Sequence, residues 1–178
     1  MFDAHVDLLE SSANASKRDT EAAGSPQNGI ARLLSTEDIL LDVDAMSRER
    51  VFIEIGRLIG ARHGLREQDV VAGLAARETV GSTALGQGVA IPHARVKGLA
   101  QAIAAFVRPR LAIPFDAPDG KPVSSLLVLL VPESATDAHL LLLAQAASMF
   151  CDKAFRDRLR ACVGALEIVA TFAEWKST

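Results

Sequence analysis

The chain has 178 residues, of which 49% are hydrophobic and 23% are charged, and its formal net charge is −3 at pH 7. This length suits one ordinary domain with a substantial core, and the apolar content excludes a chain that is disordered throughout. The small negative charge argues against nucleic acid as a partner, because nucleic-acid-binding domains present a basic face.

The chain begins with a polar segment. Between Glu10 and Gly29 it is rich in Ser, Ala, Asn and Gly and holds no large apolar side chain. Such a segment cannot bury enough surface to offset its ordering entropy. The first residues also lack the basic leader and apolar stretch of a signal peptide. We therefore expect a flexible N-terminal tail over residues 1–29 and a folded domain over residues 30–178.

Local signals in the first part of the domain predict a strand over residues 39–43 and then two helices. Ser47 is a suitable N-cap for the first helix, and Gly64 is well placed to end it. The apolar residues of this helix fall at helical spacing, and they are Val51, Phe52, Ile55, Leu58 and Ile59. The second helix is expected to bury Val70, Val71 and Leu74 and to carry Arg77 and Glu78 in its last turn.

Residues 81–93 interrupt this pattern, because they hold three glycines and a proline directly before a histidine. Nearly continuous apolar runs at residues 102–108 and 124–131 then predict strands that are buried on both faces. A turn is expected between them, at residues 118–122. Helices are expected over residues 137–150, 153–162 and 165–175. This order of helices, strands and helices indicates an α/β sandwich.

Membrane insertion and a disulfide framework are both argued against. The longest apolar runs, residues 126–131 and 140–144, fall well short of the roughly 20 residues of a spanning helix. Cys151 and Cys162 are interpreted as two core thiols in a reducing compartment, since nothing around them has zinc-ligand spacing. The expected location is the cytoplasm.

Of the four histidines, His93 has the most distinctive setting. Pro92 fixes its own φ and favours an extended Ile91, so the chain is delivered rigidly to the histidine. Gly86 and Gly88 leave backbone accessible upstream, where amide groups could approach an anion. Two interpretations stay open at this point: a functional histidine, and a histidine that only bonds to a nearby carbonyl.

His139 lies near the start of the helix predicted over residues 137–150. The positive end of that helix disfavours an imidazolium and favours an anion. A neutral imidazole is what a nucleophile or a donor to phosphate requires. On its own, His139 is better explained as a residue that helps to cap the helix. His5, outside the core, and His63, at a helix end, are interpreted as solvated or structural.

Arg77 precedes the glycine-rich segment by four residues. Together with two histidines it suggests phosphate binding, because a planar guanidinium binds phosphate oxygens in bidentate fashion. It also argues against a metal between the histidines, beside which no carboxylate in the sequence completes a ligand set. Ser82 and Thr83 could donate hydrogen bonds to phosphate, or only to their own turn.

Three segments of the chain resemble the enzyme IIA proteins of the bacterial phosphotransferase system, of the fructose, mannitol and nitrogen-regulatory type. They are residues 77–93 (RETVGSTALGQGVAIPH), residues 114–123 (PFDAPDGKPV) and residues 129–132 (LLVP), the last followed by a histidine at His139. The resemblance covers about residues 30–175. The amino-acid sequence of the first segment is most similar to that of the nitrogen-regulatory branch.

The resemblance implies a mixed, mostly parallel small β-sheet flanked by helices. It implies that His93 is the phosphorylated histidine, that His139 is a second active-site histidine and that Arg77 is the active-site arginine. The expected secondary phosphate-binding residues are Ser82, Thr83, Gly86 and Gly88. The relay it implies uses phosphoenolpyruvate as ultimate donor and a histidine-phosphorylated carrier protein as direct donor, and it requires no cofactor.

Two departures from the family pattern are mild. Ala94 stands where many relatives have a glycine, which could alter the local backbone, and Leu141 stands where some relatives have another histidine. Three functions stay open: a nitrogen-regulatory IIA whose phosphorylation state controls regulatory partners, a sugar-transport IIA that passes phosphate to a fructose- or mannitol-class IIB, and a binding module without phosphotransfer.

Overall fold

The computed structural model describes residues 29–134 and 137–176. The tail expected over residues 1–29 therefore lies outside the described residues, except for Gly29. Gly29 begins a short helix, α2 (Gly29–Leu33), which the sequence analysis did not predict. Ile30 of this helix is fully buried, so the packed core begins where the polar segment ends.

A mixed sheet forms the centre of the molecule, as expected. Its order is β1 (Ile39–Val43), β5 (Ile103–Pro109), β6 (Ser125–Pro132), β3 (Val89–Ala90) and β2 (Ala84–Gly86), with β4 (His93–Val96) also paired to β6. Strand β6 is antiparallel to β5 along one edge and parallel to both β3 and β4 along the other. The β1–β5 pair is parallel, and the β2–β3 pair is antiparallel.

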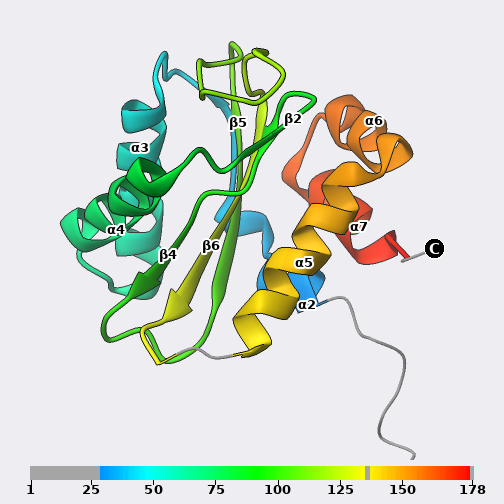
Figure 1. The fold of residues 1–178 in the computed structure, drawn as a ribbon. Coiled ribbons are helices and arrows are strands. Elements are labelled where there is room, and N and C mark those ends of the chain that lie inside the picture. The colour runs from blue at the N-terminus through cyan, green and yellow to red at the C-terminus, as the bar shows by residue number, and fades with distance from the viewer. Residues whose placement is uncertain (1–28, 135–136, 177–178) are drawn as a thin grey trace, which may run out of the picture.

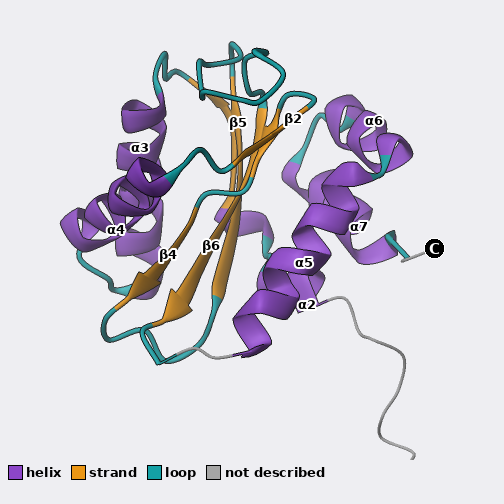
Figure 2. Ribbon diagram, viewed as in Figure 1, coloured by secondary structure: helices purple, strands orange, loops and turns teal. Residues whose placement is uncertain are grey.

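Helices cover both faces of this sheet (Figure 1). One face carries α3 (Arg48–His63) and α4 (Glu67–Val80). The other carries α2 together with α5 (Asp137–Cys151), α6 (Lys153–Ala161) and α7 (Ala165–Glu174). Figure 2 shows the resulting three layers, with strands between two layers of helices. A 3-10 turn, η1 (Thr36–Asp38), leads into β1.

The two helical layers produce two separate hydrophobic cores. Along β6, Leu126, Val128 and Leu130 pack toward the α3 and α4 layer, while Leu127 and Leu129 pack toward the other. Because successive side chains of a strand point to opposite faces, a strand covered on both sides is apolar at every position. This explains the continuous apolar runs that predicted β5 and β6.

The local capping signals of α3 are confirmed. The Ser47 side chain accepts a hydrogen bond from the Arg50 amide at 3.3 Å. Gly64 adopts a left-handed φ of 70° and donates its amide to the Gly60 carbonyl at 3.1 Å. The three helices expected after residue 136 are also confirmed, with bounds that differ from the prediction by one residue or less.

His63 is structural, one of the two roles predicted for it, because its Nε2 lies 3.1 Å from Oδ1 of Asp38. Two expectations need correction. Cys162 is a buried thiol as expected, whereas Cys151 is exposed at the end of α5. The segment 81–93 contains β2 and β3, whose hairpin forms because Gly86, Gln87 and Gly88 all have positive φ.

Among the described residues, no helix combines the length and the hydrophobicity needed to span a bilayer.

Candidate functional site

Arg77, His93 and His139 come together around one pocket. Its volume is about 270 Å³, and its walls are Gly73, Arg77, His93, Ala94, Arg95 and His139. Helix α4 supplies the first two residues, β4 the next three and the start of α5 the last. Arg77 and His139, separated by 62 positions in the chain, therefore meet because α4 packs against β4 and α5, in the opposite layer, packs against β6, the strand paired with β4.

His93 is the first residue of β4, so its backbone is fixed by the sheet. It is paired with Leu129 of β6, whose amide donates to the Pro92 carbonyl at 2.9 Å. Strand β3 ends at Ala90 and a new strand begins at His93, so Ile91 and Pro92 connect the two strands.

Both nitrogens of the His93 imidazole have partners. Nδ1 lies 2.9 Å from the Ile91 carbonyl oxygen, which can only accept, so Nδ1 carries the hydrogen. Nε2 accepts a hydrogen bond from Nε of Arg77 at 3.0 Å. The neighbours of the ring therefore select the neutral tautomer whose lone pair is on Nε2.

The surroundings of His93 also favour its neutral form. Burial is the largest cause that lowers the pKa of His93 below its ordinary value of 6.5, and electrostatic interactions with Arg77 and His139 lower it further. The Ile91 carbonyl and the negative charge of Glu78 act in the opposite direction without cancelling these effects. A buried imidazole beside a guanidinium loses stability when it gains a proton.

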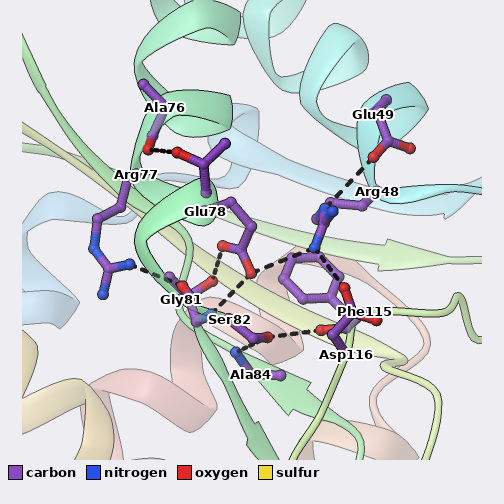
Figure 3. Close-up of polar contacts among 12 residues, drawn as sticks. Arg48, Glu49, Ala76, Arg77, Glu78, Gly81, Ser82, Ala84, Phe115 and Asp116 are labelled. Carbon is purple, nitrogen blue, oxygen red and sulfur yellow. Dashed lines mark hydrogen bonds and ion pairs between the residues drawn. The ribbon is translucent and has the colours of Figure 1, made fainter.

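Arg77 is oriented by two contacts from one guanidinium. Besides the bond from Nε to His93, Nη1 donates to the Gly81 carbonyl at 2.9 Å. Figure 3 shows Arg77 directed away from the neighbouring Glu78, toward Gly81. The bond to Gly81 closes the end of α4 and leaves Nη2, a further donor, for a ligand.

His139 lines the pocket from the first turn of α5. Its Nδ1 is buried and has no hydrogen-bond partner among the described residues. At the positive end of a helix, an unpartnered imidazole is suited to an anion. Within residues 29–134 and 137–176, no group of three His, Cys, Asp or Glu side chains is placed to hold a metal ion.

The hydroxyls of Ser82 and Thr83 are engaged within the protein. Ser82 Oγ donates to the Phe115 carbonyl at 2.7 Å, and Thr83 Oγ1 donates to Oε2 of Glu78 at 2.7 Å. Neither residue is among those that line the pocket. Of the two roles that the sequence left open for these hydroxyls, the structure shows only intramolecular bonding.

Gly86 and Gly88 serve the β2–β3 turn. Their φ values of 81° and 78° are left-handed, a conformation that side chains other than glycine rarely adopt. A Cβ added at Gly86 would lie 3.1 Å from the Asp119 carboxyl carbon, and Asp119 accepts the Gln87 amide at 2.8 Å. These glycines are absent from the walls of the pocket, so nothing in the geometry supports their predicted contact with phosphate.

Two residues that shape the pocket were not predicted from the sequence. Arg95 stands two positions after His93 on β4, and side chains two apart on a strand share a face. Gly73 stands four positions before Arg77 on α4, which places both on the same side of the helix. The spacing from His93 could have identified Arg95 in the sequence, and the spacing from Arg77 could have identified Gly73.

Gly73 also accommodates the residue that departs from the family pattern. Ala94 is 5% exposed and faces α4. A Cβ added at Gly73 would lie 3.2 Å from the Cβ of Ala94, closer than methyl groups normally pack. The absence of a side chain on the helix thus makes room for the methyl group on the strand, and β4 keeps its regular pairing with β6.

Comparison with known protein families gives one match over most of the chain. Residues 32–175 match the family model described as "Phosphoenolpyruvate-dependent sugar phosphotransferase system, EIIA 2". Among curated proteins, a nitrogen regulatory protein of Pseudomonas aeruginosa is 41% identical over 132 residues, which cover 74% of this chain and 86% of that protein.

Solved structures show the same fold. The nitrogen regulatory protein IIA-Ntr of Neisseria meningitidis has a TM-score of 0.77 and 46% sequence identity, over 80% of this chain and 98% of that one. A complex of enzyme IIAMTL with phosphorylated enzyme IIBMTL from Escherichia coli contains a chain with a TM-score of 0.66 and 17% identity, over 80% of this chain and 98% of that one. At 17% identity this likeness shows the fold alone.

Proposed function

Because the chain belongs to the EIIA type-2 family of the phosphoenolpyruvate-dependent sugar phosphotransferase system, we propose that it is a phosphocarrier that accepts a phosphoryl group on His93. The observation that carries this proposal is the state of the His93 ring: neutral, with Nδ1–H bonded to Ile91 and the Nε2 lone pair beside a guanidinium. A nucleophile for phosphorus requires such a lone pair.

The proposed donor is a carrier protein phosphorylated on a histidine. The Nε2 lone pair of His93 attacks phosphorus, a new N–P bond forms, and the old one breaks with its electron pair left on the donor ring. A donor ring that enters protonated leaves as a neutral imidazole, while His93 keeps its hydrogen on Nδ1 and becomes the phosphoimidazolium. Charge and protons therefore balance, and the Ile91 carbonyl stabilises the hydrogen that the product ring carries.

Arg77 occupies the nucleophilic lone pair before the reaction. Its Nε–H must leave Nε2 as phosphorus approaches, and the guanidinium then faces the phosphoryl oxygens, which it binds in bidentate fashion. His139 and Arg95 complete the walls from which the oxygens could be contacted. Such transfers depend mainly on positioning and charge stabilisation, and no resident cofactor is needed.

The regulatory branch of the family is the better supported role. Proteins that carry the name nitrogen regulatory protein include a curated relative that is 41% identical to the chain and a solved structure that is 46% identical. We propose that phosphorylation of His93 changes which regulatory partners bind, since it adds up to about two negative charges at one surface. We also propose that this relay, with phosphoenolpyruvate as its ultimate donor, works in the cytoplasm.

Transfer to a IIB partner is the second candidate function. It is favoured by the fold shared with a IIA protein that was solved in complex with phosphorylated IIB. The two roles differ in one measurable step: whether phosphate leaves His93 for a fructose- or mannitol-class IIB protein.

The decisive experiment incubates the protein with phosphoenolpyruvate, enzyme I and the histidine carrier protein, followed by intact mass measurement. We expect a gain of one phosphate that is labile in acid and absent in His93→Ala. No gain, or a gain that survives in His93→Ala, would refute the phosphocarrier. Addition of a IIB protein to the phosphorylated form then separates the two roles, because only a sugar-transport IIA should lose its phosphate to it.

A further inference from the structure

Glu78 is a buried carboxylate directly after Arg77, and the proposed reaction assigns it no part. Its side chain is 3% exposed, and a carboxylate is rarely buried to this degree unless it is paired. Figure 3 shows that Glu78 points to the side of α4 opposite Arg77, toward the loop that follows the helix. Glu78 therefore contacts this loop and not the pocket.

Both oxygens of Glu78 bind the same residue. Oε1 accepts the backbone amide of Thr83 at 2.9 Å, and Oε2 accepts the Thr83 hydroxyl at 2.7 Å. Two bonds from one carboxylate to one residue fix both the position and the orientation of Thr83. Hydrogen bonds to an ionised acceptor are about twice as strong as those between neutral groups.

The charge of Glu78 has a partner in Arg48, at the start of α3. Nη1 of Arg48 lies 3.7 Å from Oε1 of Glu78 and 3.2 Å from Oδ2 of Asp116. The Arg48 guanidinium also lies over the Phe115 ring, 5.6 Å from its centroid. The buried carboxylate is therefore compensated, and the same arginine joins α3 to the loop that contains Phe115 and Asp116.

Thr83 is the first residue of one path of hydrogen bonds to His93, and it lies two residues from the start of a second path. Along the first, the Thr83 carbonyl accepts the Ile91 amide at 3.0 Å. The Ile91 carbonyl in turn accepts Nδ1–H of His93 at 2.9 Å. This path fixes the tautomer and the rotation of the imidazole.

The second path reaches the other nitrogen. Gly81 lies two residues before Thr83, and its carbonyl accepts Nη1 of Arg77 at 2.9 Å. Nε of the same guanidinium then donates to Nε2 of His93 at 3.0 Å. Displacement of Thr83 would thus disturb the ring at Nδ1 through Ile91 and at Nε2 through Arg77.

We infer that Glu78 is a positioning residue for phosphoryl transfer, which acts by holding Thr83 and, through it, both hydrogen-bond partners of the His93 ring. This inference rests on the proposed function of His93. Glu78 touches neither the imidazole nor a phosphoryl group. Its contribution is the alignment of Nε2 with phosphorus, to which transfer rates are sensitive because small misplacements cost large factors in rate.

The experiment compares Glu78→Ala, Glu78→Gln and Asp116→Asn with the wild-type protein. Glu78→Gln keeps an oxygen for the Thr83 amide and an NH2 group that can donate to the Thr83 hydroxyl, whereas Glu78→Ala removes both contacts. Asp116→Asn is the matched control, since it removes a carboxylate from the same arginine and leaves Thr83 untouched. Initial rates are measured over a range of phosphorylated carrier concentrations, after the folded fraction of each variant is established by circular dichroism.

We expect Glu78→Ala to lower kcat by about tenfold or more, with KM for the carrier within about twofold of wild type. Glu78→Gln should recover most of kcat, and Asp116→Asn should match wild type. An independent readout needs no transfer: the ¹⁵N chemical shifts of the His93 ring should show hydrogen on Nδ1 in wild type and a mixture of tautomers in Glu78→Ala.

Should Glu78→Ala fail to fold, Thr83→Val replaces it, because it removes the hydroxyl contact but keeps the backbone amide. Either a kcat within about twofold of wild type in the folded variant or an unchanged tautomer would overturn the inference. A loss confined to KM would overturn it as well. A wild-type protein that accepts no phosphate would instead refute the proposed function, and the ¹⁵N shifts would still decide whether Glu78 positions the ring.

Discussion

Nε of Arg77 donates a hydrogen bond to Nε2 of His93 across 3.0 Å. The guanidinium therefore lies on the one ring nitrogen that could form a bond to phosphorus, and it both protects that lone pair and opposes its protonation. Hydrogen bonding and electrostatics act here in the same direction, because a cation beside an imidazole disfavours the imidazolium.

The first prediction concerns the pKa of His93, which burial and then the charge of Arg77 hold below 6.5. In Arg77→Gln the burial persists but the charge is lost, so the pKa should move up toward 6.5. The rate of phosphoryl acceptance should rise with pH through this pKa and then level off, because only the neutral ring attacks. NMR titration of the His93 ring carbons measures this pKa in wild type and in Arg77→Gln. Arg66→Gln, at the opposite end of α4, is the control, and an equal shift there would contradict the explanation.

A second prediction concerns His139. If it donates to a phosphoryl oxygen, His139→Ala should slow phosphorylation on the order of 10²-fold, as does removal of a single transition-state donor elsewhere. His139→Gln, which keeps a donor, should recover part of the rate. Rapid-quench assays with phosphorylated carrier measure both. Ser148→Ala, an exposed change on the same helix, should have no effect. Equal rates of phosphorylation for wild type and His139→Ala would show that His139 takes no part in the transfer.

The packing of Gly73 against Ala94 gives a third prediction, on stability. Alanine is favoured over glycine inside a helix by about 1 kcal/mol, but in the wild-type protein the new Cβ of Gly73→Ala would lie 3.2 Å from that of Ala94. The substitution should therefore stabilise the Ala94→Gly background more than it stabilises wild type. Urea unfolding of wild type, Gly73→Ala, Ala94→Gly and the double variant gives the coupling free energy between the two positions. We expect it to be about 1 kcal/mol. Strictly additive effects would show that the two positions do not compete for space.

The fourth prediction is the acid sensitivity conferred by Asp38, which is 3% exposed. Burial raises the pKa of Asp38, but hydrogen bonds from Ser35 and His63 and the charges of His63 and Arg62 together bring it below 3.8. The unfolded chain binds this proton first as pH falls, so the stabilisation is complete above pH 3.8 and is lost as pH falls through the folded-state pKa.

The measurement is the free energy of unfolding in urea between pH 3 and pH 7. The advantage of wild type over Asp38→Asn should shrink as the pH falls below about 4. Asp44→Asn is the control, since that carboxylate is 78% exposed in its pair with Arg110. A gap between wild type and Asp38→Asn that does not change with pH would contradict the prediction.

Elements with local signals were predictable from the sequence. Ser47 and Gly64 delimit α3 through bonds to residues three or four positions away, and the apolar runs of β5 and β6 reflect burial on both faces. The sequence alone did not give the strand order, in which β3 and β4 share one edge of β6. Short strands such as Val89–Ala90 have too few residues for a periodic pattern.

The site was predictable only in part, because contacts between residues that are far apart in the chain leave no local signal in the sequence. His93, His139 and Arg77 were identified through a family resemblance, and the structure brings them to one pocket. The partners of Ser82 and Thr83 could not be read from the chain, because Ser82 bonds to a carbonyl 33 residues away. Glu78 and Thr83 are only five residues apart, yet the bend after α4 that lets them meet is visible only in three dimensions.

The placement of His93 in β4, paired with β6 in the centre of the sheet, has a consequence for how its phosphorylation is sensed. A residue anchored in this way gives little freedom for the backbone to respond, so the two forms of the protein should have nearly the same shape. A partner that distinguishes them would respond to charge alone. Its preference for one form should therefore weaken as salt is added, since exposed charges are screened beyond about 10 Å at 0.1 M ionic strength.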